Sequence, residues 1–349
     1  MKRRLALIGF GTVGQGLCEI LLQKKDMLRK DYGFKWDVVA VCDINKGSLF
    51  NPKGLDVQIL LDLAGKNKSL EDYPAFAGEK NLKMGWDALK TIKKSNADII
   101  CEMSYTDIKT AQPAMDHCKT ALKNGKHVVS CNKGPAALYY NDLVRLAKKN
   151  KVHFKIEGTV MSGTPVLNLA QNELAGNQIT AISGILNGTT NYILTKMEEG
   201  QAYEEVLKEA QRLGYAEADP TADVEGFDAL AKVTILANVL MQANLKPGDI
   251  PCKGISKITL KDIEKARNAG KRWKLIGQIK RDKDGVKASV APMMIDLSHP
   301  LAGVSGATNA LTFTTDLMGD VTIIGAGAGR RETGFSILSD ILAIHKQKK

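Results

Sequence analysis

The residues with the clearest chemical potential are a group of carboxylates followed by one lysine. Residues 213–236 read LGYAEADPTADVEGFDALAKVTIL, with charged side chains at Glu217, Asp219, Asp223, Glu225, Asp228 and Lys232. Carboxylates suit a hard cation, and a lysine beside them suits proton transfer. A run of charge is also typical of a solvated loop. The spacing of these residues and the character of their neighbours help to distinguish a cation site, a catalytic site and a solvated loop.

Lys232 follows Asp228 by four residues, so the two side chains share one face if the segment is helical. On an exposed helix such a pair contributes only about 0.2–0.5 kcal/mol. The residues around Lys232 are mostly apolar, which predicts a buried helix, and a buried lysine is paired or functional. No histidine lies nearby, and the spacing does not match an EF-hand loop. The pattern favours substrate binding and catalysis over a dedicated divalent-metal site.

A glycine-rich segment near the N-terminus predicts dinucleotide binding. It matches GxGxxG, follows a short apolar run and precedes a helical pattern. In this context the first glycine permits a tight turn, the second lets the backbone approach a pyrophosphate, and the third lets helix and strand pack closely. The helix N-terminus adds unpaired N–H groups for the phosphates. The predicted cofactor-binding residues of this loop are Gly9, Phe10, Gly11, Thr12, Val13 and Gly14.

Two further residues lie where a cofactor would be held. Asp43 ends the second apolar run, the usual place for an acid that binds ribose hydroxyls, which favours NAD. Lys46 and Lys53 follow it and offer charge for the 2′-phosphate of NADP, so the choice leans only slightly to NAD. Lys133, in SCNKGPAAL, follows another predicted strand at the edge where the nicotinamide is expected. With such a cofactor, a lysine can donate the proton that an alkoxide takes after hydride transfer.

These residues require an α/β fold to position them. In residues 1–150 the strands RLALIGFG, WDVVAVCD, ADIICEMS and GKHVVSCNK alternate with helical patterns, which predicts a Rossmann-type parallel sheet. Residues 46–85 are interpreted as an irregular insertion with short helices. Residues 151–324 mix strands (286–296, 310–316, 321–329) with helices (around 165–174, 202–213, 229–242), which predicts an α+β substrate-binding and catalytic domain. The helix within 325–349 is expected to pack back on the first domain.

Composition narrows the class of protein. The net charge is +11, but the basic residues are spread along the chain and aromatic residues make up only 5%, which argues against a nucleic-acid partner. No apolar run approaches the roughly 18 residues that would span a membrane. The six cysteines form no CxxC pair, and no signal peptide precedes the first glycine loop. We expect a cytoplasmic protein with reduced thiols.

Taken together, several motifs resemble one enzyme family, homoserine dehydrogenase. The segments GFGTVG, SCNKGP, EGTVMSGTP, GILNGTTNYIL, GYAEADPTADVEGFDALAKVTIL and GAGAG occur in that family's order and cover nearly the whole chain. The resemblance implies reversible, NAD(P)H-dependent reduction of L-aspartate 4-semialdehyde to L-homoserine, in threonine and methionine biosynthesis. It also implies a homodimer formed through the second domain.

The resemblance assigns roles to individual residues. Lys232 matches the catalytic lysine that donates a proton to the aldehyde oxygen. Lys133 matches a second lysine that contacts cofactor or substrate and is the other candidate acid. Glu217 and Asp228 match carboxylates that bind the substrate. Ser104 matches a contact to the nicotinamide, and Gly214 and Gly329 match positions near the cofactor.

The motif EGTVMSGTP resembles a monovalent-cation site, with sodium as the expected ion. The implied ligands are the carboxylate of Glu157 and the backbone carbonyls of Val160, Ser162 and Thr164. Many members of the family also carry a C-terminal ACT domain or a fused aspartate kinase. This chain ends soon after GAGAG, so regulation through such a domain is not expected. Ile44 occupies the position after Asp43 where NADP-preferring relatives often carry a basic residue.

Two alternatives remain. The first is another two-domain NAD(P)-dependent dehydrogenase acting on a small amino acid or a sugar, which would share the glycine loop but lack EADPTADVEGFDALAK. The second is a non-enzymatic, dinucleotide-sensing protein whose basic surface binds nucleic acid. The scattered charge offers it no support.

Overall fold

The computed structural model describes residues 2–74 and 81–347, and the chain divides into two compact units. Unit 1 comprises Met1–Gly163 and Gly329–Lys349, and unit 2 comprises Thr164–Ala328. The first division follows residue 163 rather than residue 150, because the short strand and 3₁₀ turn at 154–159 belong to the architecture of unit 1. The chain re-enters unit 1 after residue 328 rather than residue 324, since the last strand of unit 2 extends to Ala326.

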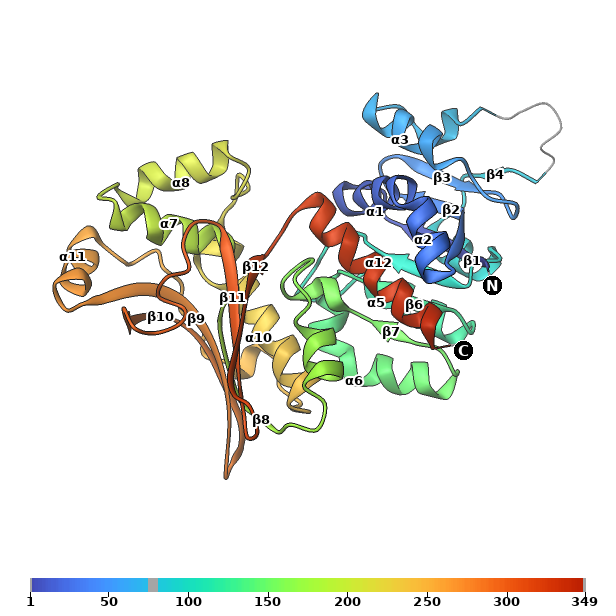
Figure 1. The fold of residues 1–349 in the computed structure, drawn as a ribbon. Helices are drawn as coiled ribbons and strands as arrows, with labels where there is room; N and C mark the ends of the chain where they lie inside the picture. The colour runs from blue at the N-terminus through green and yellow to red at the C-terminus, as the bar shows by residue number, and fades with distance from the viewer. Residues whose placement is uncertain (1, 75–80, 348–349) are drawn as a thin grey trace. The chain divides into compact units, whose positions relative to one another are not determined.

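Unit 1 is built on a seven-stranded sheet (Figure 1). In spatial order the strands are β4 (Lys83–Met84), β3 (Gly47–Phe50), β2 (Lys35–Asp43), β1 (Lys2–Ile8), β5 (Ile99–Glu102), β6 (His127–Ser130) and β7 (Phe154–Lys155). The predicted Rossmann-type parallel arrangement is confirmed for the five strands β2, β1, β5, β6 and β7. The short strands β3 and β4 extend the sheet at the β2 edge in antiparallel orientation.

The interpretation of residues 46–85 as irregular is wrong in part. This segment contains β3, the helix α3 (Val57–Gly65), a 3₁₀ turn at Leu70–Asp72 and β4. The two strands are only four and two residues long, too short for alternation to reveal them. β3 pairs with the edge of β2, and β4 pairs with β3. Residues 75–80 of the segment lie outside the described residues.

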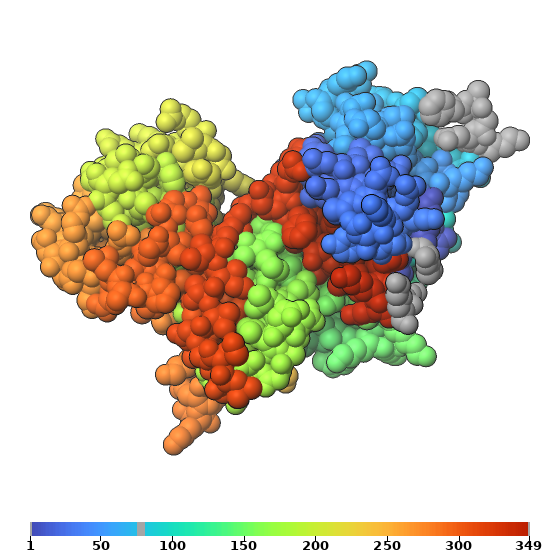
Figure 2. Space-filling view, viewed as in Figure 1, coloured from blue at the N-terminus to red at the C-terminus, as the bar shows by residue number. Residues whose placement is uncertain are grey.

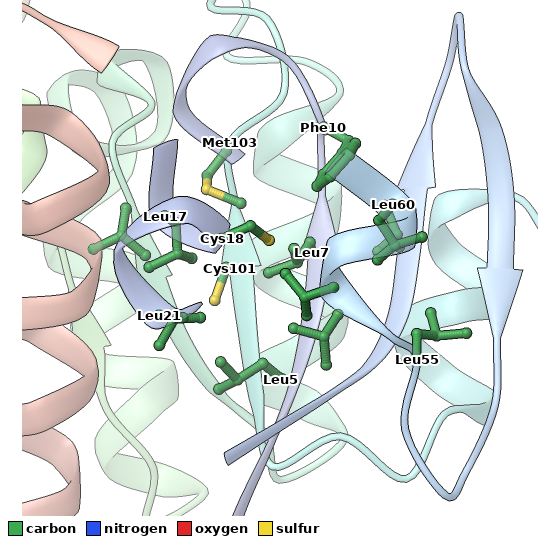
Figure 3. Packing of buried hydrophobic residues seen from close by; sticks show 14 of the residues in the cluster. Leu5, Leu7, Phe10, Leu17, Cys18, Leu21, Leu55, Leu60, Cys101 and Met103 are labelled. Atoms are coloured by element: carbon green, nitrogen blue, oxygen red, sulfur yellow. The ribbon is translucent and has the colours of Figure 1, made fainter. Parts of the chain in front are cut away.

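The core of unit 1 lies between the sheet and its helices. Figure 3 shows Leu5 and Leu7 of β1 packed with Leu17 and Leu21 of α1, with the free thiols of Cys18 and Cys101 beside them. Both faces of the central strands are buried, as expected for parallel strands covered by helices. The helices of unit 1 besides α3 are α1 (Thr12–Gln23), α2 (Lys25–Tyr32), α4 (Ala88–Lys94), α5 (Ala114–Lys123), α6 (Lys133–Lys149) and α12 (Arg330–Lys346).

The C-terminal helix α12 packs against α1 within this unit, and Figure 2 shows red C-terminal residues beside blue N-terminal ones. Glycines allow the two backbones to approach, since a Cβ on Gly16 would lie 2.2 Å from the carbonyl oxygen of Arg330. The buried guanidinium of Arg3 donates to the carbonyl of Ile344 at 3.2 Å, near the end of α12 where unpaired carbonyls accumulate. Residues separated by almost the entire chain therefore share one core.

Unit 2 is built on a five-stranded antiparallel sheet. In spatial order its strands are β10 (Gly285–Asp296), β9 (Lys271–Asp282), β8 (Ile179–Ile185), β11 (Thr308–Thr315) and β12 (Gly319–Ala326). Its helices are α7 (Gly188–Glu198), α8 (Tyr203–Arg212), α9 (Thr221–Val224), α10 (Phe227–Leu240) and α11 (Leu260–Asn268), with a π-type turn at Leu169–Glu173 and a 3₁₀ turn at Pro247–Asp249.

The strands and helices predicted for this region are present, and α10 lies against β9 and β10. The sequence analysis missed β9, because lysines and arginines flank its short apolar run on both sides and resemble a solvated segment. Within residues 2–74 and 81–347, no helix has the length and apolar character needed to cross a bilayer.

Candidate active site

Unit 1 carries a cavity of about 760 Å³ along the carboxyl ends of its central strands. One end is lined by residues 42–45, which end β2, and by residues 85–88, which precede α4. The glycine loop lines the middle, and residues 103–105, which follow β5, line the other end together with Pro113 and His117. Elongated ligands bind α/β sheets at this edge, so the cavity suits a dinucleotide.

The glycines of the loop have different roles. Gly9 has a φ of +97°, and a Cβ there would lie 2.4 Å from the carbonyl oxygen of Met103. A Cβ on Gly14 would lie 2.6 Å from the carbonyl oxygen of Gly9, so this glycine lets α1 approach the strand. Gly11 lines the cavity, and a Cβ there would meet no atom within 4 Å. Two glycines therefore shape the turn, and the third leaves open the space that a pyrophosphate needs.

The residues between the glycines contribute mainly through the backbone. The side chain of Phe10 is buried in the core, and Val13 packs partly against it. Thr12 is exposed and begins α1, where the first N–H groups have no intrahelical acceptor. A phosphate would meet these N–H groups at the positive end of the helix dipole.

Asp43 fixes the glycine loop and also lines the cavity. Its carboxylate accepts hydrogen bonds from the backbone N–H groups of Phe10 (2.7 Å), Asn45 (3.0 Å) and Lys46 (3.1 Å). A carboxylate has about four acceptor positions, which leaves room for a ribose hydroxyl. A 2′-phosphate at this position would meet a negative charge. Among the described residues that line the cavity, Lys46 and Lys53 do not appear.

Hydrogen bonds connect the end of the cavity that Ser104 lines to the helix that begins at Lys133. Ser104 lines the cavity, and its backbone N–H donates to the Glu102 carboxylate at 3.2 Å. Asn132 donates from its side-chain amide to the carbonyls of Ser104 (3.3 Å) and Tyr105 (2.9 Å), and it caps α6 by accepting from the N–H of Gly134. Lys133 is the first residue of this helix. Its backbone is therefore anchored to the segment that carries Ser104.

In unit 2 the structure brings Lys232 and Asp228 together. Lys232 lies on α10 and is only 6% exposed. Its ammonium group donates to the carbonyl of Leu186 at 2.7 Å and forms an ion pair with Asp228 at 2.7 Å. A buried ammonium is costly unless hydrogen bonds and an opposite charge replace its water shell, and both are present here.

Asn187 extends this cluster to a second carboxylate. Its side-chain amide donates to Asp223 at 2.7 Å and to Asp228 at 3.0 Å, while its oxygen caps α7 by accepting from the N–H of Thr190. Burial raises the pKa of Asp223, and the nearby negative charge of Asp228 raises it further. The sequence analysis assigned no chemistry to Asp223 or Asn187. The sequence offered one indication of a structural role for Asn187, since an asparagine before GTTN is typical of a helix N-cap.

Other predicted residues lie outside these hydrogen-bond networks. Glu217 is exposed, and within the described residues its carboxylate shows no hydrogen bond or ion pair; only its backbone carbonyl accepts from Gln211. Gly214 follows α8 with a φ of +76° and is open to solvent. Gly329, in unit 1, has a φ of +138° and precedes α12.

The residues of the expected cation site fall partly in each unit. Glu157 is 2% exposed, and its backbone N–H donates to the buried carboxylate of Asp340 at 2.9 Å. Val160 is buried, and Ser162 adopts a φ of +53° with its hydroxyl 2.7 Å from that of Thr333. Thr164 begins unit 2. The carboxylates of Glu157 and Asp340 are oxygen ligands of the kind that hard cations prefer. In the described parts of the chain no group of three or more His, Cys, Asp or Glu side chains is arranged to hold a metal ion.

Comparison with known proteins identifies relatives over the full length. A family model described as "Homoserine dehydrogenase, NAD binding domain" matches residues 9–157, and one described as "Homoserine dehydrogenase" matches residues 165–342. An NAD(+)-dependent homoserine dehydrogenase from Pseudomonas canavaninivorans is 48% identical over 98% of this chain and 96% of its own. A homoserine dehydrogenase from Methanocaldococcus jannaschii is 43% identical over 99% of both chains.

Solved structures give the same result. A putative homoserine dehydrogenase from Archaeoglobus fulgidus superposes with a TM-score of 0.87 at 36% identity, covering 98% of this chain and 99% of its own. A hyperthermophilic archaeal homoserine dehydrogenase mutant in complex with NADPH superposes with a TM-score of 0.83 at 30% identity, covering 99% and 98% of the two chains.

The open space beside Gly11 predicts that Gly11→Ala affects the cofactor and not the fold. We expect the Kd for NADH to rise by about tenfold or more, because the methyl group occupies the path of the pyrophosphate. The melting temperature of the free protein should stay at the wild-type value. Gly14→Ala is the contrasting variant and should lower that temperature, since its Cβ meets backbone. Titration with NADH and thermal denaturation measure both effects, and unchanged NADH affinity in Gly11→Ala would contradict the assignment.

The raised pKa of Asp223 predicts a pH-dependent effect of Asp223→Asn. Because the folded state holds this proton more tightly than the unfolded state, the carboxyl contributes stability at low pH that is lost as the pH rises through its folded pKa. Asparagine keeps the acceptor for Asn187 and removes the charge. We expect the variant to melt above the wild type at pH 7, with the difference disappearing towards acid pH. A melting temperature below the wild type at pH 7 would show that the charged carboxylate is net stabilising.

Proposed function

This chain belongs to the homoserine dehydrogenase family, and we propose that its dinucleotide binds in the cavity of unit 1 while its amino-acid substrate binds beside Lys232 in unit 2. It is an NAD(P)-dependent oxidoreductase that acts on a CH–OH group and interconverts L-homoserine and L-aspartate 4-semialdehyde. The observation that carries the placement of the substrate is the hydrogen-bonded series Asp223, Asn187, Asp228 and Lys232, in which Asn187 and Lys232 are buried and the two aspartates are partly exposed.

We assign the proton transfer to Lys232. Hydride addition to the aldehyde leaves an alkoxide, and an ammonium group nearby supplies its proton. The contacts to Asp228 and to the carbonyl of Leu186 hold this ammonium in one position. In the direction of homoserine oxidation the neutral amine accepts the hydroxyl proton. Lys133 is the second lysine of the proposal and contacts cofactor or substrate from unit 1.

The surroundings of Lys232 also suit the charged groups of an amino acid. Asp223 and Asp228 offer carboxylates for the α-ammonium, and Glu217 offers a third from an exposed loop. The N-terminus of α7 follows Asn187 and suits the α-carboxylate. Asn309 supports this placement: it is fully buried beside Gly188, and both atoms of its amide lack a hydrogen-bond partner within the described residues. A buried amide in that state is expected where a ligand or water completes the bonding.

For the cofactor we propose a preference for NAD over NADP. The carboxylate of Asp43 occupies the position at which a ribose hydroxyl donates and a 2′-phosphate is repelled, and Ile44 after it adds no positive charge. The relative from Pseudomonas canavaninivorans is named as NAD(+)-dependent, which agrees with this preference. The hyperthermophilic archaeal relative is described as a mutant in complex with NADPH, so NADP is the alternative that the assay must compare.

Further features of the proposal come from the family resemblance. A sodium ion would be held by Glu157 with the carbonyls of Val160, Ser162 and Thr164. The protein would act as a cytoplasmic homodimer in threonine and methionine biosynthesis. The burial of Glu157 and the nearby buried carboxylate of Asp340 support the cation.

The proposal is tested by following homoserine oxidation with NAD and NADP side by side, in sodium, potassium or choline chloride. We expect turnover with both dinucleotides, a higher kcat/KM with NAD, and a higher melting temperature with sodium than with choline at equal ionic strength. No turnover of homoserine, with oxidation of another alcohol or amine, would contradict the substrate. A higher kcat/KM with NADP would contradict the role of Asp43.

Lys232→Ala should lower kcat by about 10²–10⁴-fold and leave the Kd for NADH nearly unchanged, because the proton donor is lost and the cofactor cavity is not touched. Lys196→Ala is the matched control, since it removes another lysine–carboxylate pair of unit 2, with Glu199. It should keep a wild-type kcat. Steady-state kinetics and NADH titration measure both variants; a near-normal kcat for Lys232→Ala would refute the assignment.

A further inference from the structure

The carboxylate of Glu102 is completely buried at the end of β5, beneath the cavity of unit 1. Hydrogen bonds reach it from several directions: from the N–H and hydroxyl of Ser104, from the hydroxyl of Ser130 at 3.3 Å and from Nδ1 of His117 at 3.3 Å. Burying a carboxylate is costly, and only a dense set of donors offsets that cost. The buried carboxylate therefore depends on all of these neighbours directing their polar groups towards it.

These bonds connect the ends of two strands to the segment that lines the cavity. The hydroxyl of Ser130, at the end of β6, also donates to the backbone carbonyl of Glu102 at 2.9 Å and accepts from the N–H of Asn132 at 3.0 Å. Asn132 in turn holds the carbonyls of Ser104 and Tyr105. Glu102 thus holds this segment through the N–H and hydroxyl of Ser104, while Asn132 holds it through the carbonyls of Ser104 and Tyr105.

His117 is a ring-bearing member of this group that lines the cavity. It lies on α5, is 6% exposed and lines the cavity together with Ser104. The contact with Glu102 engages Nδ1 and fixes the plane of the ring. The other nitrogen, Nε2, is then the one that can bond to a ligand.

We propose that His117 binds the nicotinamide-riboside half of the dinucleotide through Nε2, and that Glu102 is the residue that positions it. The direction follows from the cavity. Asp43 marks the end for the adenosine ribose, the glycine loop marks the pyrophosphate, and His117 and Ser104 line the opposite end. This inference rests on the proposed placement of the dinucleotide.

His117→Asn and His117→Ala test the contact, with NADH and ADP as probes. Asparagine can keep a donor near the position of Nδ1, and so the bond to Glu102, but it has no atom at the position of Nε2. For both variants we expect the Kd for NADH to rise about 5- to 10-fold, the loss of one hydrogen bond. The Kd for ADP, which carries only the adenosine half and its phosphates, should stay within about twofold of the wild type. Asparagine should also retain the wild-type melting temperature.

Glu102→Gln tests the positioning role, and Asp98→Asn is its matched control. Asp98 lies just before β5, pairs with Arg4 at 2.8 Å and is at the opposite end of the strand from the cavity. We expect Glu102→Gln to raise the KM for the dinucleotide without changing the KM for homoserine, and Asp98→Asn to change neither. A purely structural role would weaken NADH and ADP together.

Several outcomes would overturn the inference. Wild-type affinity for NADH in both His117 variants, or equal loss of NADH and ADP, would remove His117 from the nicotinamide half while leaving the cavity as the cofactor site. Failure of the wild-type protein itself to bind ADP and NADH would refute the proposed placement of the dinucleotide, and the inference with it. If Glu102→Gln does not fold, the His117 variants decide alone.

Discussion

The backbone turn at Gly9 is the constraint on which the dinucleotide cavity depends. Its N–H bonds to the carbonyl of Cys42 at 2.8 Å, and the N–H of Met103 bonds to the carbonyl of Ile8 at 2.7 Å, so the ends of β2, β1 and β5 are joined through this point. A side chain at Gly9 would collide with Met103. Because the turn is fixed, Asp43 and Ser104 stand at opposite ends of one opening.

The charged cluster of unit 2 depends on a different principle, because its ionised groups are withdrawn from water in part and held by hydrogen bonds. Asp228 accepts hydrogen bonds from both Lys232 and Asn187. The amide of Asn187 also donates to Asp223, so it bridges the two carboxylates. The raised pKa of Asp223 shows that the arrangement carries an electrostatic cost. Such a cost is expected where groups are held ready for a ligand that brings the complementary charge.

Local patterns in the sequence predicted much of this. Hydrophobic runs located the central strands of unit 1, and the spacing of Asp228 and Lys232 indicated their contact. The strand β9 was hidden because lysines and arginines flank its short apolar run, and its pairing with β8 and β10 is a long-range property. The partners of Asn187 and His117 are also set by tertiary packing, since residues distant in the sequence or on other elements supply them. The spacing of residues along the sequence does not predict such tertiary contacts.

The way α12 joins α1 has a consequence for how the molecule is made. Unit 1 is interrupted by the whole of unit 2, so its core stays incomplete until the last helix has left the ribosome. Unit 2 is continuous in sequence, and its antiparallel sheet can form while synthesis continues. Unit 2 can then complete its fold before unit 1 does, and loss of α12 would expose the apolar face of α1 to aggregation.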